Sequence, residues 1–161
     1  AVNVSARQFH QPGFVDGIRH ILERSGADPT HLKLELTESV IIDDMEDTIE
    51  KMRALKAMGI HFSMDDFGTG YSSLSYLRQL PLDQLKIDRS FIHDLDSNLG
   101  DAEIVKSIIA MAQALGLDVI AEGVEKETQH RFLNSNDCKA YQGFLFGHPV
   151  PVSVFEKLFE T

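Results

Sequence analysis

Two adjacent carboxylates, Asp65 and Asp66, end an apolar run and are followed by a glycine-containing stretch in the sequence MDDFGTGYSSL. Carboxylates this close repel each other, so each raises the pKa of the other unless a cation lies nearby. Successive side chains on a strand point to opposite faces, but Gly68 and Gly70 allow a sharp turn that would bring both carboxylates to one spot. We therefore interpret the pair as ligands of a divalent metal. The alternative is that one Asp caps the next helix and the other is solvated.

Other polar residues stand within or directly after apolar runs. Glu35, in LELTES, falls at an inward-facing position, and it needs a metal or a lysine nearby because an unpaired buried carboxylate is costly. Asn3 offers a neutral oxygen, a normal ligand for a hard cation. Glu122, in VIAEGVE, is interpreted as a metal ligand or general base. A carboxylate at a helix start is the alternative, and that description suits Glu125 better.

A lysine, Lys86, lies inside the apolar run LKIDR, where burying an unpaired ammonium would be expensive. Near a metal-bound water, Lys86 would orient or deprotonate the nucleophile. Its alternative is a buried salt bridge, with Asp66 or Glu122 as the partner. Glu38 lies past its strand, and direct chemistry and a hydrogen bond to the glycine loop are equally open for it. Asp88 is interpreted as structural.

The elements that must position these residues alternate between short β-type runs and longer amphipathic runs, which predicts a parallel sheet covered by helices. Strands are expected over 1–5, 32–37, 60–65, 82–88, 117–123 and 139–144, and helices over 12–26, 45–59, 74–80, 101–116, 126–136 and 152–160. Both an open doubly wound sheet and a closed eight-stranded barrel use this pattern. The barrel is favoured because one rim would gather the polar residues at the strand ends, namely Asn3, Glu35, Asp65, Lys86, Glu122 and Gln142.

Composition narrows the class of protein. The 161 residues, 43% of them hydrophobic, suit one globular domain, and the net charge of −10 disfavours DNA as a partner. The seven histidines show no HExxH spacing, which argues against a zinc site. A single cysteine fits a reducing cytoplasm, and no apolar run approaches the roughly 18 residues that span a bilayer. We expect a cytoplasmic domain without direct membrane contact, taken from inside a larger protein because the chain begins at Ala1.

The motifs NVS, LELTES, MDDFGTGYSSLSYL, LKIDRSFI, VIAEGVE and YQGFLFG, in this order and spacing, resemble the EAL-domain family of bacterial cyclic di-GMP phosphodiesterases. The resemblance covers essentially the whole chain. It implies a (β/α)8 TIM-like barrel with one antiparallel strand, and hydrolysis of cyclic di-GMP to linear pGpG with a pair of Mg²⁺ or Mn²⁺ ions. The metal ligands that it implies are Asn3, Glu35, Asp65, Asp66 and Glu122.

The resemblance also implies roles for the remaining site residues. Lys86 would hold the attacking water, Glu122 would bind metal or act as the base, and Gln142 would support the shell of metal-bound water. Glu38 would anchor a mobile loop that couples the site to a dimer helix, with the helix 74–80 near the dimer contact. That loop would consist of Phe67, Gly68, Thr69, Gly70, Tyr71 and Ser72.

The chain departs from the family pattern because the Glu-Ala-Leu signature and the first two strands lie before residue 1 in the family order. Residues 1–161 are therefore expected to be the C-terminal part of one EAL domain, an incomplete barrel of six βα units. Its open edges would invite a homodimer or a domain-swapped oligomer. His148 stands where the family often has Lys or Arg.

Phosphodiesterase activity is expected in the intact parent protein, and weak or absent activity is expected in this segment alone. The parent is expected to have sensory or GGDEF-type domains, which would carry any membrane anchor. A non-catalytic module that binds cyclic di-GMP is the second hypothesis, and an interaction fragment without a site is the third. The presence of every metal ligand of the covered region favours catalysis.

Overall fold

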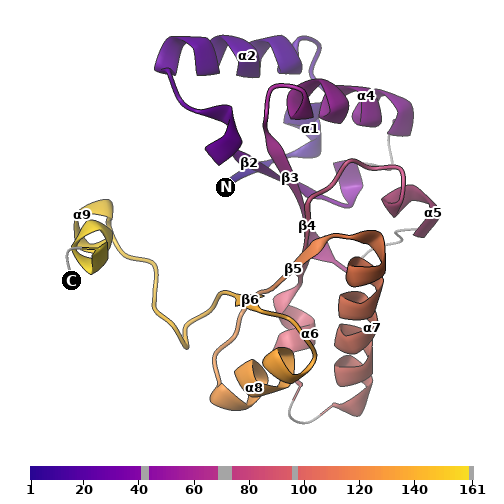
Figure 1. Cartoon of the computed structure of the whole chain (residues 1–161), viewed down its shortest axis with the longest axis vertical. Coiled ribbons are helices and arrows are strands. Elements are labelled where there is room, and N and C mark those ends of the chain that lie inside the picture. The colour runs from indigo at the N-terminus through magenta and orange to yellow at the C-terminus, as the bar shows by residue number, and fades with distance from the viewer. Residues whose placement is uncertain (41–43, 69–73, 96–97, 160–161) are drawn as a thin grey trace.

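One parallel sheet forms the centre of the computed structural model, which describes residues 1–40, 44–68, 74–95 and 98–159 (Figure 1). Its order is β1-β2-β3-β4-β5-β6, and each neighbouring pair is parallel. The strands are β1 (Val2–Val4), β2 (Lys33–Thr37), β3 (His61–Phe67), β4 (Gln84–Ile87), β5 (Asp118–Ala121) and β6 (Ala140–Tyr141). The predicted α/β class is confirmed, and the sheet is consistent with part of a barrel whose edges are β1 and β6.

Helices follow the strands along the chain and lie around the outside of the curved sheet (Figure 1). They are α1 (Ala6–Phe9), α2 (Phe14–Ser25), α4 (Met45–Lys56), α5 (Leu74–Leu77), α6 (Arg89–His93), α7 (Leu99–Leu115), α8 (Glu127–Ser135) and α9 (Val152–Phe155), with 3-10 turns η1 (Pro29–His31) and η2 (Glu156–Phe159). The predicted helix over 74–80 is wrong in extent, because α5 ends at Leu77.

Two short helices, α1 and α6, were missed by the sequence pattern, and side-chain caps explain both. Ser5 and Gln8 form a capping box at α1. Asp88 accepts a hydrogen bond from the backbone nitrogen of Ser90, at 2.9 Å, and so caps α6. The interpretation of Asp88 as structural is thereby confirmed.

Strand β3 does not end where the sequence predicts. It continues past Asp65 to Phe67, and its pairing with β4 shifts between Met64 and Phe67. Met64 pairs with Leu85 and Phe67 pairs with Ile87, so β3 has one more residue than β4 between these two pairs. An extra residue on one strand of a pair is a β-bulge. The backbone therefore bends earlier than expected, because Asp66 within the strand already has a positive φ of 53°, and Gly68 follows with a φ of 98°.

The core lies between the outer face of the sheet and the helices. Buried Leu34 and Leu36 on β2 alternate with Glu35, which therefore points to the inner face. Other large buried side chains of the same core are Phe62, Met64, Leu85, Ile87, Met52, Leu55 and Val105. Because the apolar side chains of each strand pack against the helices, the polar side chains that alternate with them face the inside of the curved sheet.

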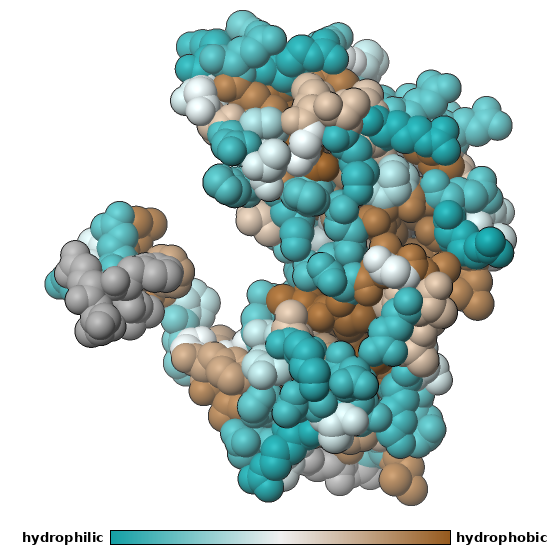
Figure 2. All heavy atoms as spheres, viewed as in Figure 1, coloured by the Kyte–Doolittle hydropathy of each residue, from teal (hydrophilic) through white to brown (hydrophobic). Residues whose placement is uncertain are grey.

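Beyond β6, the chain leads away from the body as a C-terminal arm, residues 147–159, that carries α9 (Figure 1). Figure 2 shows apolar surface where this arm joins the body, and Phe144 and Phe146 are about half exposed there. Within the described ranges, no helix combines the length and the apolar composition needed to cross a bilayer.

Candidate active site at the strand ends

A buried lysine lies at the centre of the polar cluster. The side chain of Lys86, on β4, is 6% exposed, and its Nζ lies 2.9 Å from Glu35 Oε2, 2.8 Å from Asp65 Oδ1 and 2.7 Å from Glu122 Oε1. These carboxylates come from β2, from β3 and from the residue directly after β5. The buried salt bridge expected as an alternative for Lys86 is present, with Glu122 as one partner and with Asp65 and Glu35 as two more.

The surroundings of Lys86 and Glu122 set their protonation. Burial lowers the pKa of Lys86, but hydrogen bonds to Asp65, Glu122 and Glu35 outweigh it and raise the pKa above the ordinary lysine value. Burial raises the pKa of Glu122, and the charges of Asp65 and Glu35 add to this, against the hydrogen bond and charge of Lys86. In this metal-free state, Lys86 keeps its proton and donates hydrogen bonds, and Glu122 accepts a proton more readily than an ordinary glutamate does.

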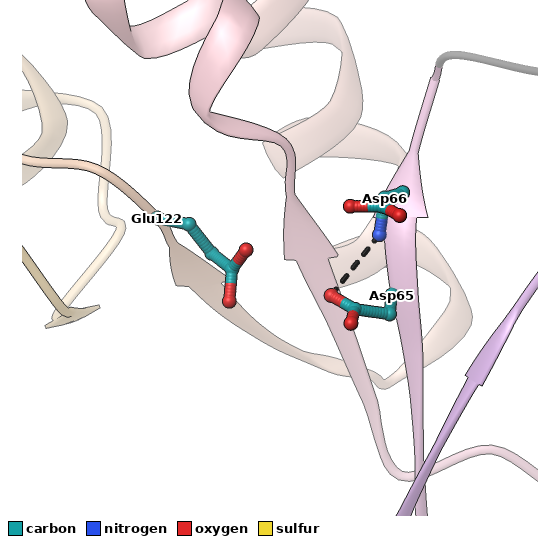
Figure 3. Close-up of side chains that lie close together, drawn as sticks. All are labelled: Asp65, Asp66 and Glu122. Carbon is teal, nitrogen blue, oxygen red and sulfur yellow. Dashed lines mark hydrogen bonds between the residues drawn. The ribbon is translucent and has the colours of Figure 1, made fainter. Parts of the chain in front are cut away.

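The two adjacent aspartates lie together with Glu122. Each of Asp65, Asp66 and Glu122 offers an oxygen, and these oxygens lie within 4.8 Å of one another (Figure 3). The backbone nitrogen of Asp66 donates to Asp65 Oδ1 at 3.1 Å. Burial raises the pKa of Asp66, and the charges of Asp65 and Asp88 raise it further. The prediction that both aspartates face one spot is confirmed, and their repulsion favours a bound cation there.

The side chain of Asn3, on β1, faces the same cluster. Its amide oxygen points toward Glu35 Oε2 and Asp65 Oδ2, and after a flip the amide nitrogen would donate to both at 3.3 Å. The flipped orientation satisfies the metal-free side chain, and the other orientation would present the amide oxygen to a cation. Carboxylate and amide oxygens are the ligands that hard divalent ions prefer. The donor set therefore fits a divalent cation.

The predicted supporting residues lie next to these groups. Gln142 Nε2 donates to Glu122 Oε1 at 2.6 Å. Glu38 is buried and accepts a hydrogen bond from the backbone nitrogen of Gly68 at 3.0 Å, which is the loop contact expected as one of its two alternatives. Phe67 ends β3, and Gly68 has a φ of 98°. The rest of the predicted loop, Thr69, Gly70, Tyr71 and Ser72, lies outside the described residues.

A cavity of about 730 Å³ opens beside Glu122 and Gln142, and several of its residues were not singled out from the sequence. Arg89, the first residue of α6, lines it together with Tyr141 and Phe144. A volume in this range suits a small-molecule or nucleotide ligand. The only signal for Arg89 was its place in LKIDRSFI, because the helix that it begins was not predicted.

Two glycines next to the site residues were also missed. A Cβ on Gly143 would lie 2.1 Å from the backbone oxygen of Val124, and one on Gly123 would lie 2.6 Å from Arg89 Cβ. The Gly143 contact is with backbone, which cannot move aside cheaply, so a side chain at that position would push apart the segments that carry Glu122 and Gln142. The glycines in AEGVE and YQGF were the available signal.

The EAL domain family model matches residues 1–149. Over 157 residues the chain is 48% identical to the cyclic di-GMP phosphodiesterase NbdA of Pseudomonas aeruginosa, covering 98% of this chain and 20% of that protein. The structure of the PaMucR phosphodiesterase in complex with c-di-GMP is 47% identical, with a TM-score of 0.91 over 95% of this chain and 62% of that chain. A manganese and cyclic di-GMP complex of Klebsiella pneumoniae BlrP1 is 32% identical, with a TM-score of 0.82 over 91% of this chain and 38% of that chain. The chain spans about a fifth of the length of the curated relatives that it matches first, 20% and 22%.

Proposed function

Because the chain belongs to the EAL domain family, we propose that its site takes part in the metal-dependent hydrolysis of cyclic di-GMP to linear pGpG. The observation that carries the proposal is the convergence of three carboxylates on the buried Nζ of Lys86, with Asp66 and Asn3 beside them. The names of NbdA and of the c-di-GMP complex of PaMucR support the substrate.

The oxygens of the cluster would hold the divalent ions, Mg²⁺ or Mn²⁺, through Asn3, Glu35, Asp65, Asp66 and Glu122. A bound divalent ion supplies charge for the phosphate oxygens and acidifies a bound water. The manganese complex of BlrP1 supports Mn²⁺. The acidic net charge of the chain is no obstacle to an anionic substrate, since cations stand between carboxylates and phosphate.

The protein's own groups would then position and deprotonate the water. The three N–H groups of Lys86 are used by Glu35, Asp65 and Glu122. One of them would turn to the water oxygen where a cation takes over its carboxylate, and it would then orient the water toward phosphorus. Glu122 would take the proton of the water on its carboxylate. Gln142 fixes the Glu122 carboxylate through its 2.6 Å hydrogen bond. Attack at phosphorus would break its bond to the ribose 3′ oxygen in one of the two phosphodiester links. That oxygen would leave and take a proton from solvent, which gives the linear dinucleotide.

The test uses the protein at its natural full length, stripped of metal with a chelator and supplied with Mg²⁺ or Mn²⁺. Conversion of cyclic di-GMP to pGpG is followed by liquid chromatography. We expect turnover only with metal, and a loss of roughly 100-fold in Asp65→Asn and Glu122→Gln. Asp118→Asn, an exposed aspartate at the other end of β5, is the matched control and should retain activity.

Two outcomes would reject the proposal. Binding of cyclic di-GMP measured by calorimetry, without turnover under any metal, would replace hydrolysis by a binding module. Absence of both binding and turnover would reject any role in cyclic di-GMP signalling and leave an interaction role.

Self-association is a separate proposal that rests on the sheet edges. Strands β1 and β6 end the sheet, and an unpaired strand edge is a template for pairing with another chain. We propose that the isolated 161-residue chain forms a homodimer or a domain-swapped oligomer. Sedimentation velocity checks this, and a monomer at every concentration tested would contradict it.

A further inference from the structure

The amide side chain of Gln129, on α8, is buried and fully used in hydrogen bonds. The residue is 1% exposed. Its Oε1 accepts from the backbone nitrogens of Glu125, at 2.8 Å, and Lys126, at 2.9 Å. Its Nε2 donates to the backbone oxygens of Ile92, at 3.0 Å, and His93, at 3.4 Å. A glutamine amide has one accepting oxygen and two donor hydrogens, so no capacity is left for another role.

These four bonds join two backbone segments that carry site residues. Glu125 and Lys126 belong to the loop that begins at Glu122, directly after β5. Ile92 lies in α6, which begins shortly after Lys86 and follows β4. Figure 1 shows α6 and α8 near each other at the same end of the molecule, as these bonds require. Gln129 therefore ties the segment of Glu122 to the segment of Lys86.

The four contacts of Gln129 satisfy backbone groups at two different helix ends. The two bonds to Oε1 satisfy free N–H groups at the start of α8, which is ordinary helix capping. The two bonds from Nε2 reach the last two carbonyls of α6, so one side chain joins the start of α8 to the end of α6. Strands β4 and β5 are paired, and the backbone nitrogen of Glu122 donates to the backbone oxygen of Ile87 at 3.1 Å, so the sheet already aligns the two strand ends. Gln129 adds a second tie beyond those ends, between the loop that follows Glu122 and α6.

We infer that Gln129 is a positioning residue that holds Glu122 against Lys86 by tying the loop after β5 to α6. The expected effect of Gln129 on turnover rests on the proposed function. Its expected effect on the positions of the site residues rests on the geometry alone. A residue that orients a metal ligand from outside typically changes metal affinity or activity by about 10- to 100-fold when it is lost.

The experiment compares two substitutions in the full-length protein. Gln129→Glu keeps the oxygens that cap α8 but removes the donors to Ile92 and His93. Gln129→Met keeps the approximate size and removes all four bonds. Gln113→Glu and Gln113→Met, at an exposed position of α7, are the matched controls. Each variant is measured for Mn²⁺ affinity by paramagnetic resonance, for kcat and KM with cyclic di-GMP, and for thermal unfolding.

For both Gln129 variants we expect the Mn²⁺ dissociation constant to rise, and kcat to fall, by about tenfold or more, with KM changed less than about twofold. The Gln113 variants should match the wild type. Wild-type kcat and Mn²⁺ affinity in folded Gln129→Glu would overturn the inference and reduce the residue to a helix cap.

The two variants also protect the test against unfolding. If Gln129→Met does not fold, Gln129→Glu decides, because it keeps the cap. If Gln129→Glu melts early, it is assayed below its own transition, and normal Mn²⁺ affinity there still overturns the inference. A wild-type protein that binds Mn²⁺ but hydrolyses nothing would reject the proposed function alone, since the comparison of Mn²⁺ affinities still tests Gln129.

Discussion

Removing the central ammonium should destabilise the metal-free protein. Lys86→Met keeps most of the side-chain volume and removes three contacts of 2.7–2.9 Å with Glu122, Asp65 and Glu35. The pKa of Lys86 is raised, so its stabilising contribution is complete below the ordinary lysine pKa of 10.5 and is lost only as pH rises through the higher folded value. At neutral pH, the whole contribution is therefore available to be lost.

The magnitude follows from the burial of the partners. The side chains of Glu35, Asp65 and Glu122 are 13%, 14% and 17% exposed, so water can do little to replace the ammonium. Leaving one partner of a buried ion pair behind costs about 3–5 kcal/mol. The carboxylates can relieve part of this by taking up protons, so we expect about 3 kcal/mol at pH 7. For a chain of this size, that is about 6–12 °C in the unfolding midpoint.

The assay is thermal unfolding by circular dichroism at neutral pH in the presence of a chelator. The matched control is Lys106→Met, because Lys106 Nζ lies 2.8 Å from Glu103 Oε1 in a pair whose side chains are 44% and 72% exposed. An exposed pair of the same length contributes about 0–1 kcal/mol. The contact distances are then matched, and the two substitutions differ in the burial and in the number of the carboxylates left behind.

The cluster also predicts how the Lys86→Met defect responds to its surroundings. Adding Mn²⁺ should raise the midpoint of Lys86→Met more than that of the wild type, because the cation replaces missing positive charge. Lowering the pH toward about 5 should shrink the gap, since the freed carboxylates become protonated. A variant that melts with the wild type under chelator, or no sooner than Lys106→Met, would refute the reasoning that these carboxylates need the ammonium.

Three further predictions concern the neighbours of the cluster. Gly143→Ala should lower Mn²⁺ affinity and turnover by about tenfold, because its Cβ meets the Val124 backbone, whereas a Cβ at Gly147 meets nothing within 4 Å and Gly147→Ala should change neither. Asp66→Ala should unfold about 1 kcal/mol more easily than Asp66→Gly in urea, since both remove the carboxylate but only glycine accepts a φ of 53° without strain. Burial, followed by neighbouring charges, raises the pKa of both Asp66 and Glu122, so protons compete with a cation at higher pH than usual. Mn²⁺ affinity by calorimetry should therefore fall between about pH 8 and about pH 5, and a constant affinity would contradict this.

The fold and the gathering of the site followed from local patterns. Strand β2 shows why, because the alternation in LELT places Leu34 and Leu36 in the core and leaves Glu35 on the inner face. Parallel strands end at one edge, so polar residues at successive strand ends meet without any long-range information. This is how Glu35, Asp65 and Glu122 could be predicted as neighbours although long stretches of sequence separate them.

The parts that could not be predicted depend on single backbone positions and on contacts between segments. The bulge at Asp66 does not change the alternation of apolar and polar residues, so the sequence does not distinguish it from a strand that ends at Asp65. Helix α6 is too short to show a helical period, and its cap by Asp88 involves one side chain. Gln129 reads in sequence as one polar residue of an amphipathic helix, and only the fold shows that its amide reaches Ile92.

The charges of the site explain why a lysine and a divalent cation belong in the same cluster. Four carboxylates, Glu35, Asp65, Asp66 and Glu122, face one ammonium, so Lys86 cannot balance them alone. Burial is the main cause of the raised pKa of Asp66 and of Glu122, and the neighbouring carboxylate charges raise both further. Lys86 instead orders carboxylates from separate strands before a cation arrives, which lowers the cost of assembling the ligands. Under the proposed function, the proton held by Lys86 would make it a donor and not a base, which leaves the acceptor role to a carboxylate of the cluster, and we assign that role to Glu122.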